Sequence, residues 1–352
     1  MVRILWGDSL ESEKLRRTSS RAFQNPHLWS LLGAVRFLLA AIVWSFHSDI
    51  ATLNHDSYFN YLGRFRTMPA LIGFFVISGF SIAHSISQRP EGFYLRRVAR
   101  IYPVYFVCSI IAGALYFVPG ARDVFMQTTV AAPTLLMAAG NVLLLQTYLT
   151  TPILGPSWSL AVEVGYYVLA PIFMRLKRDW LYVIALLSAA SFLYGNTIGW
   201  GEYVYPNATG LKFCVFAWAW LSGFLFYLEK RSLRSLLLLA AGFPLVMLYN
   251  ALLPALATYF VVFITLRYGE HIYLSERMSA LFEYLGNLSY PLYLCHICVF
   301  VALRGIFNIT NGFAHLFVSL VASALLYHLV DRPVRKFIAG INSQWIKGKA
   351  FP

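Results

Sequence analysis

Charged residues are scarce in this chain of 352 residues, where Asp, Glu, Lys and Arg together make up 12% of the sequence. Soluble domains carry about twice that share of charge, so the composition excludes an ordinary soluble enzyme. Acidic residues are the fewest, with 15 against 28 Lys and Arg, while hydrophobic residues reach 59%. We therefore expect an all-α, polytopic integral membrane protein.

Cysteine is also scarce. The four cysteines lie inside apolar runs, where a cysteine usually behaves as a small buried hydrophobe: Cys108, Cys214, Cys295 and Cys298. The stretch Cys295-His-Ile-Cys298 lacks the second ligand pair that a structural zinc site needs. We predict neither a disulfide nor a metal site.

Linkers rich in Pro, Gly and Ser are absent, and so is the pattern of a cleavable signal peptide. The first 28 residues are polar and charged, and the first long apolar run follows them. We expect an N-terminal tail at 1–28, one membrane domain at 29–337 and a C-terminal tail at 338–352.

Hydropathy divides the membrane domain into eleven candidate helices. They lie near 31–50, 70–88, 101–118, 131–149, 157–175, 180–195, 209–228, 233–249, 251–268, 285–304 and 312–331. The segment at 131–149 is the poorest of them, because Pro133, Gly140, Asn141 and Gln146 interrupt it.

The basic loops decide how many segments cross, because Lys and Arg cluster on the cytoplasmic side of membrane proteins. These loops are the N-terminal tail and residues 89–100, 175–179, 229–234, 267–277 and 331–336. All six fall on one side if 131–149 does not cross. We therefore predict about ten transmembrane helices, both termini in the cytoplasm, and an outer loop that partly re-enters the membrane near 131–149.

The first apolar run, 36-RFLLAAIVWSFH-47, carries a cation and an imidazole at its two ends. In a helix, Arg36 and His47 would share one face, roughly 16 Å apart along the axis. Either residue alone could extend to a headgroup layer. Two ionisable groups on one stripe, with Ser45 as the polar residue between them, favour a line that faces a cavity rather than lipid.

A second basic motif, 96-RRVARIYP-103, places Arg97 and Arg100 one turn apart at a helix start. The two arginines are either positive-inside anchors or a fork for phosphates, which guanidinium binds bidentately. The preceding segment, 74-FFVISGFSIAH-84, carries Ser78 and Gly79, small residues that usually let helices approach closely. We expect His84 to be a packing or interfacial residue.

Glu163, within 157-SWSLAVEVGYYVLAP-171, is one of few carboxylates inside an expected span, where an unpaired charge is costly. It is either a structural partner for a buried cation such as Arg36 or a functional group at a depth close to that of His47. His296, in 289-SYPLYLCHICVF-300, is either a core histidine bonded across helices or a site residue.

These motifs, in this order, resemble those of the acyltransferase 3 family of integral-membrane acyltransferases. The resemblance runs from about residue 29 to 337 and rests on the Arg36–His47 pair, 75-FVISGF-80, 97-RVARIYP-103, 158-WSLAVE-163 with Tyr167 and Pro171, 286-GNLSYPLYLCH-296 and 331-DRP-333. Two positions depart from the family: Gly33 replaces a frequent aspartate, and Cys295 replaces an aromatic residue. The first departure removes a possible partner for Arg36.

The resemblance implies the transfer of acetyl or another short acyl group from cytoplasmic acyl-CoA to a carbohydrate hydroxyl on the other side of the membrane. The implied acceptor is an exopolysaccharide, a lipopolysaccharide or a lipid-linked sugar. We expect the stand-alone form, without the esterase-like domain of some members, in a bacterial cytoplasmic (inner) membrane. The expected partners are acetyl-CoA, the glycan and membrane lipids, with no nucleic acid.

Acyl transfer to an alcohol needs a base for the hydroxyl proton and a site for the developing oxyanion. We expect His47, Glu163 and Arg36 to be catalytic, with Glu163 orienting His47. The donor-binding candidates are Arg97, Arg100, Arg36, Ser78, Trp158 and Ser159. The acceptor-site candidates are Tyr167, His296 and Tyr293. Direct transfer and an acyl-histidine intermediate both fit these residues.

An alternative of another class is a non-enzymatic carrier or flippase for lipid-linked sugars, whose cavity would also need cations and histidines. The two halves show no internal repeat, and few buried carboxylates are available for ion coupling, which disfavours a carrier. The sequence leaves open the acceptor, including a lipid or peptide amine, as well as the acyl chain and the oligomeric state.

Overall fold

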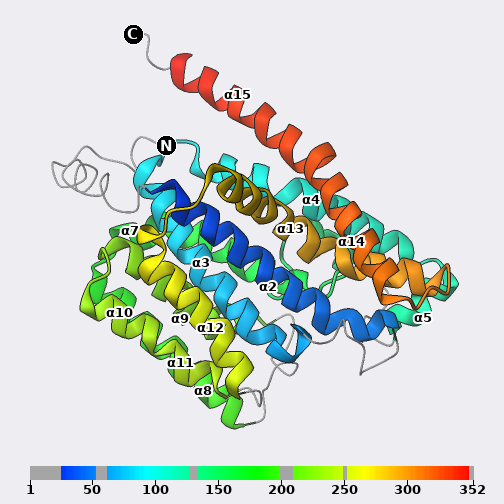
Figure 1. The fold of residues 1–352 in the computed structure, drawn as a ribbon, viewed down its shortest axis with the longest axis horizontal. Helices are drawn as coiled ribbons and strands as arrows, with labels where there is room; N and C mark the ends of the chain where they lie inside the picture. The colour runs from blue at the N-terminus through cyan, green and yellow to red at the C-terminus, as the bar shows by residue number, and fades with distance from the viewer. Residues whose placement is uncertain (1–24, 53–61, 127–133, 199–208, 249–251, 349–352) are drawn as a thin grey trace.

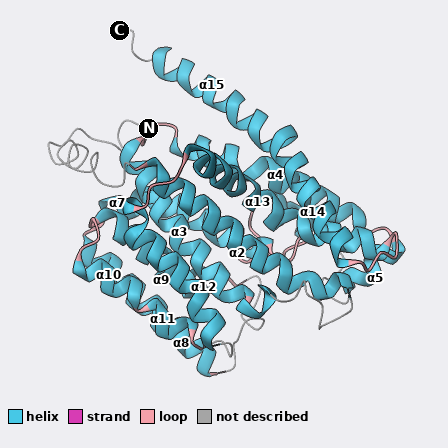
Figure 2. Cartoon of the chain, viewed as in Figure 1, coloured by secondary structure: helices cyan, strands magenta, loops and turns pink. Residues whose placement is uncertain are grey.

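The computed structural model describes residues 25–52, 62–126, 134–198, 209–248 and 252–348. Within these ranges the chain forms helices and turns without a β-strand, which confirms the all-α prediction (Figure 2). The helices are α2 (Pro26–Thr52), α3 (Thr67–Gln88), α4 (Phe93–Leu115), α5 (Pro119–Met126), α6 (Leu135–Val142), α7 (Ser157–Arg175), α8 (Arg178–Thr197), α9 (Leu211–Leu228), α10 (Leu233–Ala240), α11 (Gly242–Val246), α12 (Leu252–Tyr268), α13 (Glu276–Gly305), α14 (Gly312–Leu326) and α15 (Arg332–Gly348).

Eight helices of the described residues are long and apolar enough to cross a membrane. They are α2, α3, α4, α7, α8, α9, α13 and the continuous helix that starts with α14. The protein is therefore a polytopic integral membrane protein. The other two expected spans are shorter: α12 has 17 residues, and the segment at 233–249 is divided into α10 and α11. Pro244 explains the division. In a continuous helix its ring would clash with the carbonyl of Ala240, four residues earlier, and α10 ends at that residue.

The C-terminal helices form one continuous rod. A π-helical turn at Tyr327–Asp331 joins α14 to α15, and α15 extends beyond the rest of the bundle (Figure 1). The expected boundary between membrane domain and tail, at residue 338, falls inside α15.

The described part of the segment at 131–149 does not form a spanning helix. It contains α6, of 8 residues, followed by a turn. Asn141 stabilises this turn: its side-chain amide donates to the carbonyl of Thr151 over 2.9 Å, and its Oδ1 accepts from the Ile153 N–H over 3.0 Å. A buried, non-helical backbone needs such partners, which explains the polar residues in this apolar segment.

Helices α3 and α9 approach closely through two glycines. A Cβ at Gly79 would lie 1.9 Å from the carbonyl oxygen of Trp220, and one at Gly223 would lie 1.9 Å from that of Val76. Small residues at a helix interface allow this backbone contact. The structural interpretation of Gly79 is therefore confirmed.

Helices α3 and α9 also run in the same direction. Near their first halves, the rings of Phe75 and Phe216 lie 5.7 Å apart, and near their ends His84 Nδ1 lies 3.2 Å from the Tyr227 hydroxyl. Between them in the chain, α4, α7 and α8 alternate in direction. The end of α4 and the start of α7 therefore lie on the same side of the bundle, as the parallel α3 and α9 require.

The connections that follow α3, α7, α9 and α12 lie on one side of the bundle, which we call the basic face. It carries residues 89–92, 176–177, 229–232 and 269–275 and the start of α2. Arg231 pairs with Glu270 over 2.8 Å, and the Glu270 carbonyl accepts from Asn25 over 2.6 Å. Burial lowers the pKa of Arg231, and the Glu270 carboxylate opposes that shift.

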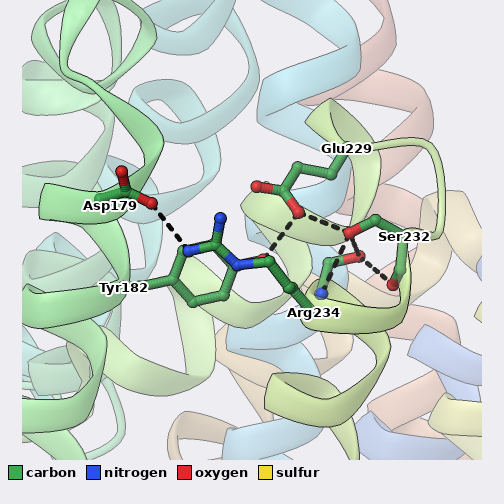
Figure 3. A network of polar contacts seen from close by, with 6 residues as sticks. Asp179, Tyr182, Glu229, Ser232 and Arg234 are labelled. Atoms are coloured by element: carbon green, nitrogen blue, oxygen red, sulfur yellow. Dashed lines mark hydrogen bonds and ion pairs between the residues drawn. The ribbon is translucent and has the colours of Figure 1, made fainter.

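Figure 3 shows how the start of α8 meets the α9–α10 connection and the start of α10. Arg234 pairs with Asp179 over 2.7 Å, and the Tyr182 hydroxyl donates to Glu229 over 2.8 Å. Several basic stretches that were expected to share one side of the membrane therefore lie together in the fold.

Candidate active site

A cavity of about 600 Å³ lies among α2, α3, α4, α7 and α13. Its wall contains eight of the predicted site residues: Arg36, Ser78, Arg97, Arg100, Ser159, Glu163, Tyr167 and Tyr293. On α3 the lining extends from Leu71 to Gln88, about 25 Å along the helix axis. The cavity thus reaches from the basic face through most of the length of this helix.

The packing of α2 against α13 brings distant parts of the sequence to this cavity. A Cβ at Gly33 would lie 2.7 Å from the Phe282 carbonyl oxygen, and one at Gly286 would lie 2.5 Å from the Gly33 Cα. The backbone of α13 therefore occupies the space beside Gly33. An aspartate side chain would therefore not fit at this position.

Positive charge dominates the end of the cavity at the basic face, where Arg36, Arg89, Arg96, Arg97 and Arg100 line the wall. The Nε atoms of Arg36 and Arg97 are buried without a hydrogen-bond partner in the described part of the chain. Within that part, no ion pair joins Arg36, Arg97 or Arg100 to a carboxylate. Because buried charges without a counter-charge are costly, this wall is suited to an anionic ligand.

Glu163 contributes negative charge to the same wall. It accepts a hydrogen bond from the hydroxyl of Tyr167, one turn later on α7, and that hydroxyl lies 3.2 Å from Ser78 Oγ. Glu163 attracts the guanidinium groups of Arg36 and Arg97 through space, although no direct ion pair forms. These relations favour a role in balancing the buried cations.

Hydroxyl groups occupy the opposite end of the cavity. Ser159 Oγ lies 2.8 Å from the Tyr293 hydroxyl, and both hydroxyls donate to the Pro156 carbonyl, over 3.2 and 3.0 Å. The ring of Phe74 packs against Tyr293 edge to face, with centroids 5.8 Å apart. This end of the cavity is therefore lined by hydroxyl groups.

His47 and His296 form a pair next to this end. His47 Nδ1 lies 3.0 Å from His296 Nε2, and the two rings meet edge to edge, with centroids 5.2 Å apart and an interplanar angle of 20°. Neither ring lines the cavity, but Tyr293, which does, has its ring centroid 6.3 Å from that of His296. Both histidines thus lie behind the hydroxyl end.

Two expectations about side-chain partners differ from the structure. Trp158 lies outside the cavity wall, where it packs on Phe216 with Lys212 Nζ 4.5 Å from its ring centroid. Glu163, expected to orient His47, is bonded to Tyr167 instead, and His296 is the partner of His47.

Sequence reasoning missed part of the wall near the basic face. His84, interpreted as a packing residue, lines the cavity together with Trp29, and their rings lie 4.3 Å apart. A signal was available: Ser78, Ser81 and Ser85 recur at helical spacing and mark a polar stripe on α3. Among the described residues, no group of three or more His, Cys, Asp or Glu side chains is placed to hold a metal ion.

Comparison with known proteins supports the resemblance seen in the motifs. Acyltransferase MdmB from Streptomyces mycarofaciens is 34% identical over 120 residues, which are 30% of this chain and 28% of that protein. The match therefore spans less than a third of the relative's length. No solved structure shows a significant match to the chain. Residues 29–328 match the family model described as an acyltransferase domain, and the chain belongs to the acyltransferase 3 family.

Proposed function

We propose that this protein is a membrane acyltransferase that moves an acetyl or other short acyl group from coenzyme A to a carbohydrate hydroxyl across the membrane. The acceptor would be an exopolysaccharide, a lipopolysaccharide or a lipid-linked sugar. The observation that carries the proposal is the cavity, which joins an arginine-lined end to a hydroxyl end beside the His47–His296 pair. Membership of the family supports the reaction type.

The arginine-lined end would bind the phosphates of the donor. Guanidinium groups bind phosphate bidentately, and the orphaned Nε atoms of Arg36 and Arg97 offer donors there. Arg89 and Arg96 add charge where the cavity meets the basic face. Pockets of roughly 300–1,000 Å³ hold ligands of drug size, so a cavity of about 600 Å³ suits a long, thin donor.

The basic face would lie in the cytoplasm, because positively charged loops are retained there. Acyl-CoA would then enter from the cytoplasm, and both termini would lie on that side of a bacterial inner membrane. His47 lies roughly 16 Å farther along α2 than Arg36, toward the opposite face. The thioester would thus cross much of the membrane while the nucleotide stays at the basic face.

The chemistry would take place beside the hydroxyl end. An acceptor oxygen attacks the thioester carbon while its proton passes to His47, and the new C–O bond replaces the C–S bond. The thiolate leaves with the electron pair of that bond and is then protonated. The Ser159 or Tyr293 hydroxyl, each of which donates to the Pro156 carbonyl in the empty site, would turn its hydrogen toward the developing oxyanion. We assign Arg36 to donor binding, because its distance from His47 separates it from the reacting carbonyl.

The test is transfer of radiolabel from acetyl-CoA. Sealed inverted membrane vesicles that contain the protein would receive labelled acetyl-CoA on their outer, cytoplasmic face, and the glycan and lipid-linked sugar fractions would then be counted. We expect label in one of these fractions, or slow acetyl-CoA hydrolysis when the acceptor is absent.

A carrier or flippase would produce neither result. Vesicles in which acetyl-CoA stays intact and no fraction gains label, with acceptor lipids present and the protein folded, would contradict the proposal. Vesicles with the His315→Gln variant serve as a control that should keep the transfer, because His315 lies on α14 outside the cavity and bonds to the carbonyl of Ile309, before that helix.

A further inference from the structure

We infer that His296 is a positioning residue: it holds the proton of His47 on Nδ1, so that His47 Nε2 is the base for the acceptor hydroxyl. This inference rests on the proposed function and adds a residue to its mechanism. It starts from two hydrogen bonds that share the His296 ring.

The first bond determines the tautomer of His296. Its Nδ1 lies 3.2 Å from the carbonyl oxygen of Leu292, one turn earlier on α13. A carbonyl oxygen only accepts, so Nδ1 carries the hydrogen. A neutral imidazole has one N–H, which leaves His296 Nε2 as an acceptor.

The second bond then determines the tautomer of His47. His47 Nδ1 lies 3.0 Å from His296 Nε2, and because that atom accepts, His47 Nδ1 must donate. The lone pair of His47 is therefore on Nε2. Nε2 is then the atom that would take the proton of a substrate hydroxyl.

The surroundings hold the His296 ring in place. His296 is 0% exposed, and Phe300 packs edge-on against it with ring centroids 5.6 Å apart. The Tyr293 ring lies beside it, with centroids 6.3 Å apart. A buried ring with these contacts keeps both hydrogen bonds aligned through a reaction cycle.

A neutral partner suits this depth in the membrane. When His47 takes the acceptor proton on Nε2, its Nδ1–H stays bonded to His296, which stabilises the cation as the aspartate does in hydrolase triads. An imidazole achieves this without a buried carboxylate, which would be costly in the empty site. The proton then passes to the departing thiolate, which restores neutral His47 and releases the thiol of coenzyme A.

Three variants of His296 separate the bond from mere packing. A glutamine amide reaches about as far as imidazole Nε2, whereas an asparagine amide reaches only about as far as Nδ1. We expect His296→Gln to retain kcat within about 5-fold of wild type. We expect His296→Asn and His296→Leu to lose about 100-fold, the low end for a positioned acid–base group, with KM for acetyl-CoA within about 2-fold.

A spectroscopic readout tests the tautomer without activity. In proteoliposomes labelled with ¹⁵N-histidine, the His47 signal, assigned by its loss in His47→Gln, should show a protonated Nδ1 and an unprotonated Nε2. In His296→Leu the proton should move to Nε2 in part of the population.

The outcomes separate this inference from the proposed function. A wild-type His47 protonated on Nε2, or equal kcat values for His296→Leu and wild type, would overturn the role of His296. Lack of acetyl transfer by the wild type together with a His47 Nδ1–H would instead refute the proposed function and leave the tautomer assignment standing. A His296→Gln variant as inactive as His296→Leu, with unchanged acetyl-CoA binding, would also overturn the inference.

Discussion

Replacing Arg97 by glutamine should weaken donor binding without destabilising the empty protein. In the structure, Arg97 Nε is buried without a hydrogen-bond partner in the described residues, and Nη2 donates to Ser85 Oγ over 3.2 Å. The neighbouring charges of Arg100 and Arg96 repel its guanidinium group. The charge of Arg97 in turn repels the guanidinium group of Arg36. Glutamine removes this repulsion together with the attraction of Glu163, and its amide can still donate hydrogen bonds, so the empty protein should unfold at about the same temperature as wild type.

The effect on acetyl-CoA binding follows from the lost contact. A hydrogen bond to a charged group contributes about 1.5–3 kcal/mol, so the Kd for acetyl-CoA should rise about 10- to 150-fold. At a donor concentration about 100 times the wild-type Kd, bound donor stabilises the folded protein by about 2.7 kcal/mol. By the same relation, the same concentration of acetyl-CoA would stabilise the folded variant by only about 0.3–1.4 kcal/mol.

The assay is thermal unfolding of the detergent-purified protein with and without acetyl-CoA. Lys177→Gln is the matched control, because Lys177 is exposed on the basic face and does not line the cavity. If acetyl-CoA stabilised Arg97→Gln as much as wild type, the reasoning would be refuted, and Arg97 would be a positive-inside anchor rather than a donor-binding residue. A large loss of stability in the empty variant would show that Arg97 is structural.

Three further predictions address catalysis, packing and topology. His47→Ala should fold, keep its stabilisation by acetyl-CoA and lose at least about 100-fold in transfer rate; a rate within a few-fold of wild type at equal protein level would make His47 a bystander. Gly79→Ala should destabilise the protein by about 1–3 kcal/mol or more, because its Cβ would lie 1.9 Å from a carbonyl oxygen of α9. Gly113→Ala, whose Cβ meets nothing within 4 Å, should be neutral or slightly stabilising, and equal unfolding temperatures for the two variants would contradict the close approach. Gly155→Cys should react with a membrane-impermeant thiol reagent from outside and Lys177→Cys from the cytoplasm; reaction of Gly155→Cys from the cytoplasm alone would refute the ten-helix topology.

The sequence by itself determined the fold class and the motifs because both depend on local properties. A span needs a long apolar run and satisfies its own backbone hydrogen bonds, so composition and hydropathy identify it. Hydropathy counted 131–149 as a candidate span, and the distribution of the basic loops identified it as non-spanning, in agreement with the polar residues such as Asn141 that interrupt it. The break at Ala240 was also readable from Pro244, but averaging hydropathy over the segment concealed it.

Distances along one helix were also predictable. The spacing of Arg36 and His47 placed them on one stripe of α2, and the structure has Arg36 in the cavity wall and His47 against α13. A helix has a fixed rise and rotation per residue, so such relations need no knowledge of other helices.

Partners across helices were decided by the tertiary structure alone. The sequence placed Glu163 and His47 at similar depth and suggested that they pair, yet Glu163 bonds to Tyr167 and His47 bonds to His296. Depth along the membrane normal says nothing about which helices are neighbours or how each is rotated about its axis. Both depend on how the side chains and glycines of the whole bundle pack, as at the contact of Gly33 with α13 that brings His47 to His296.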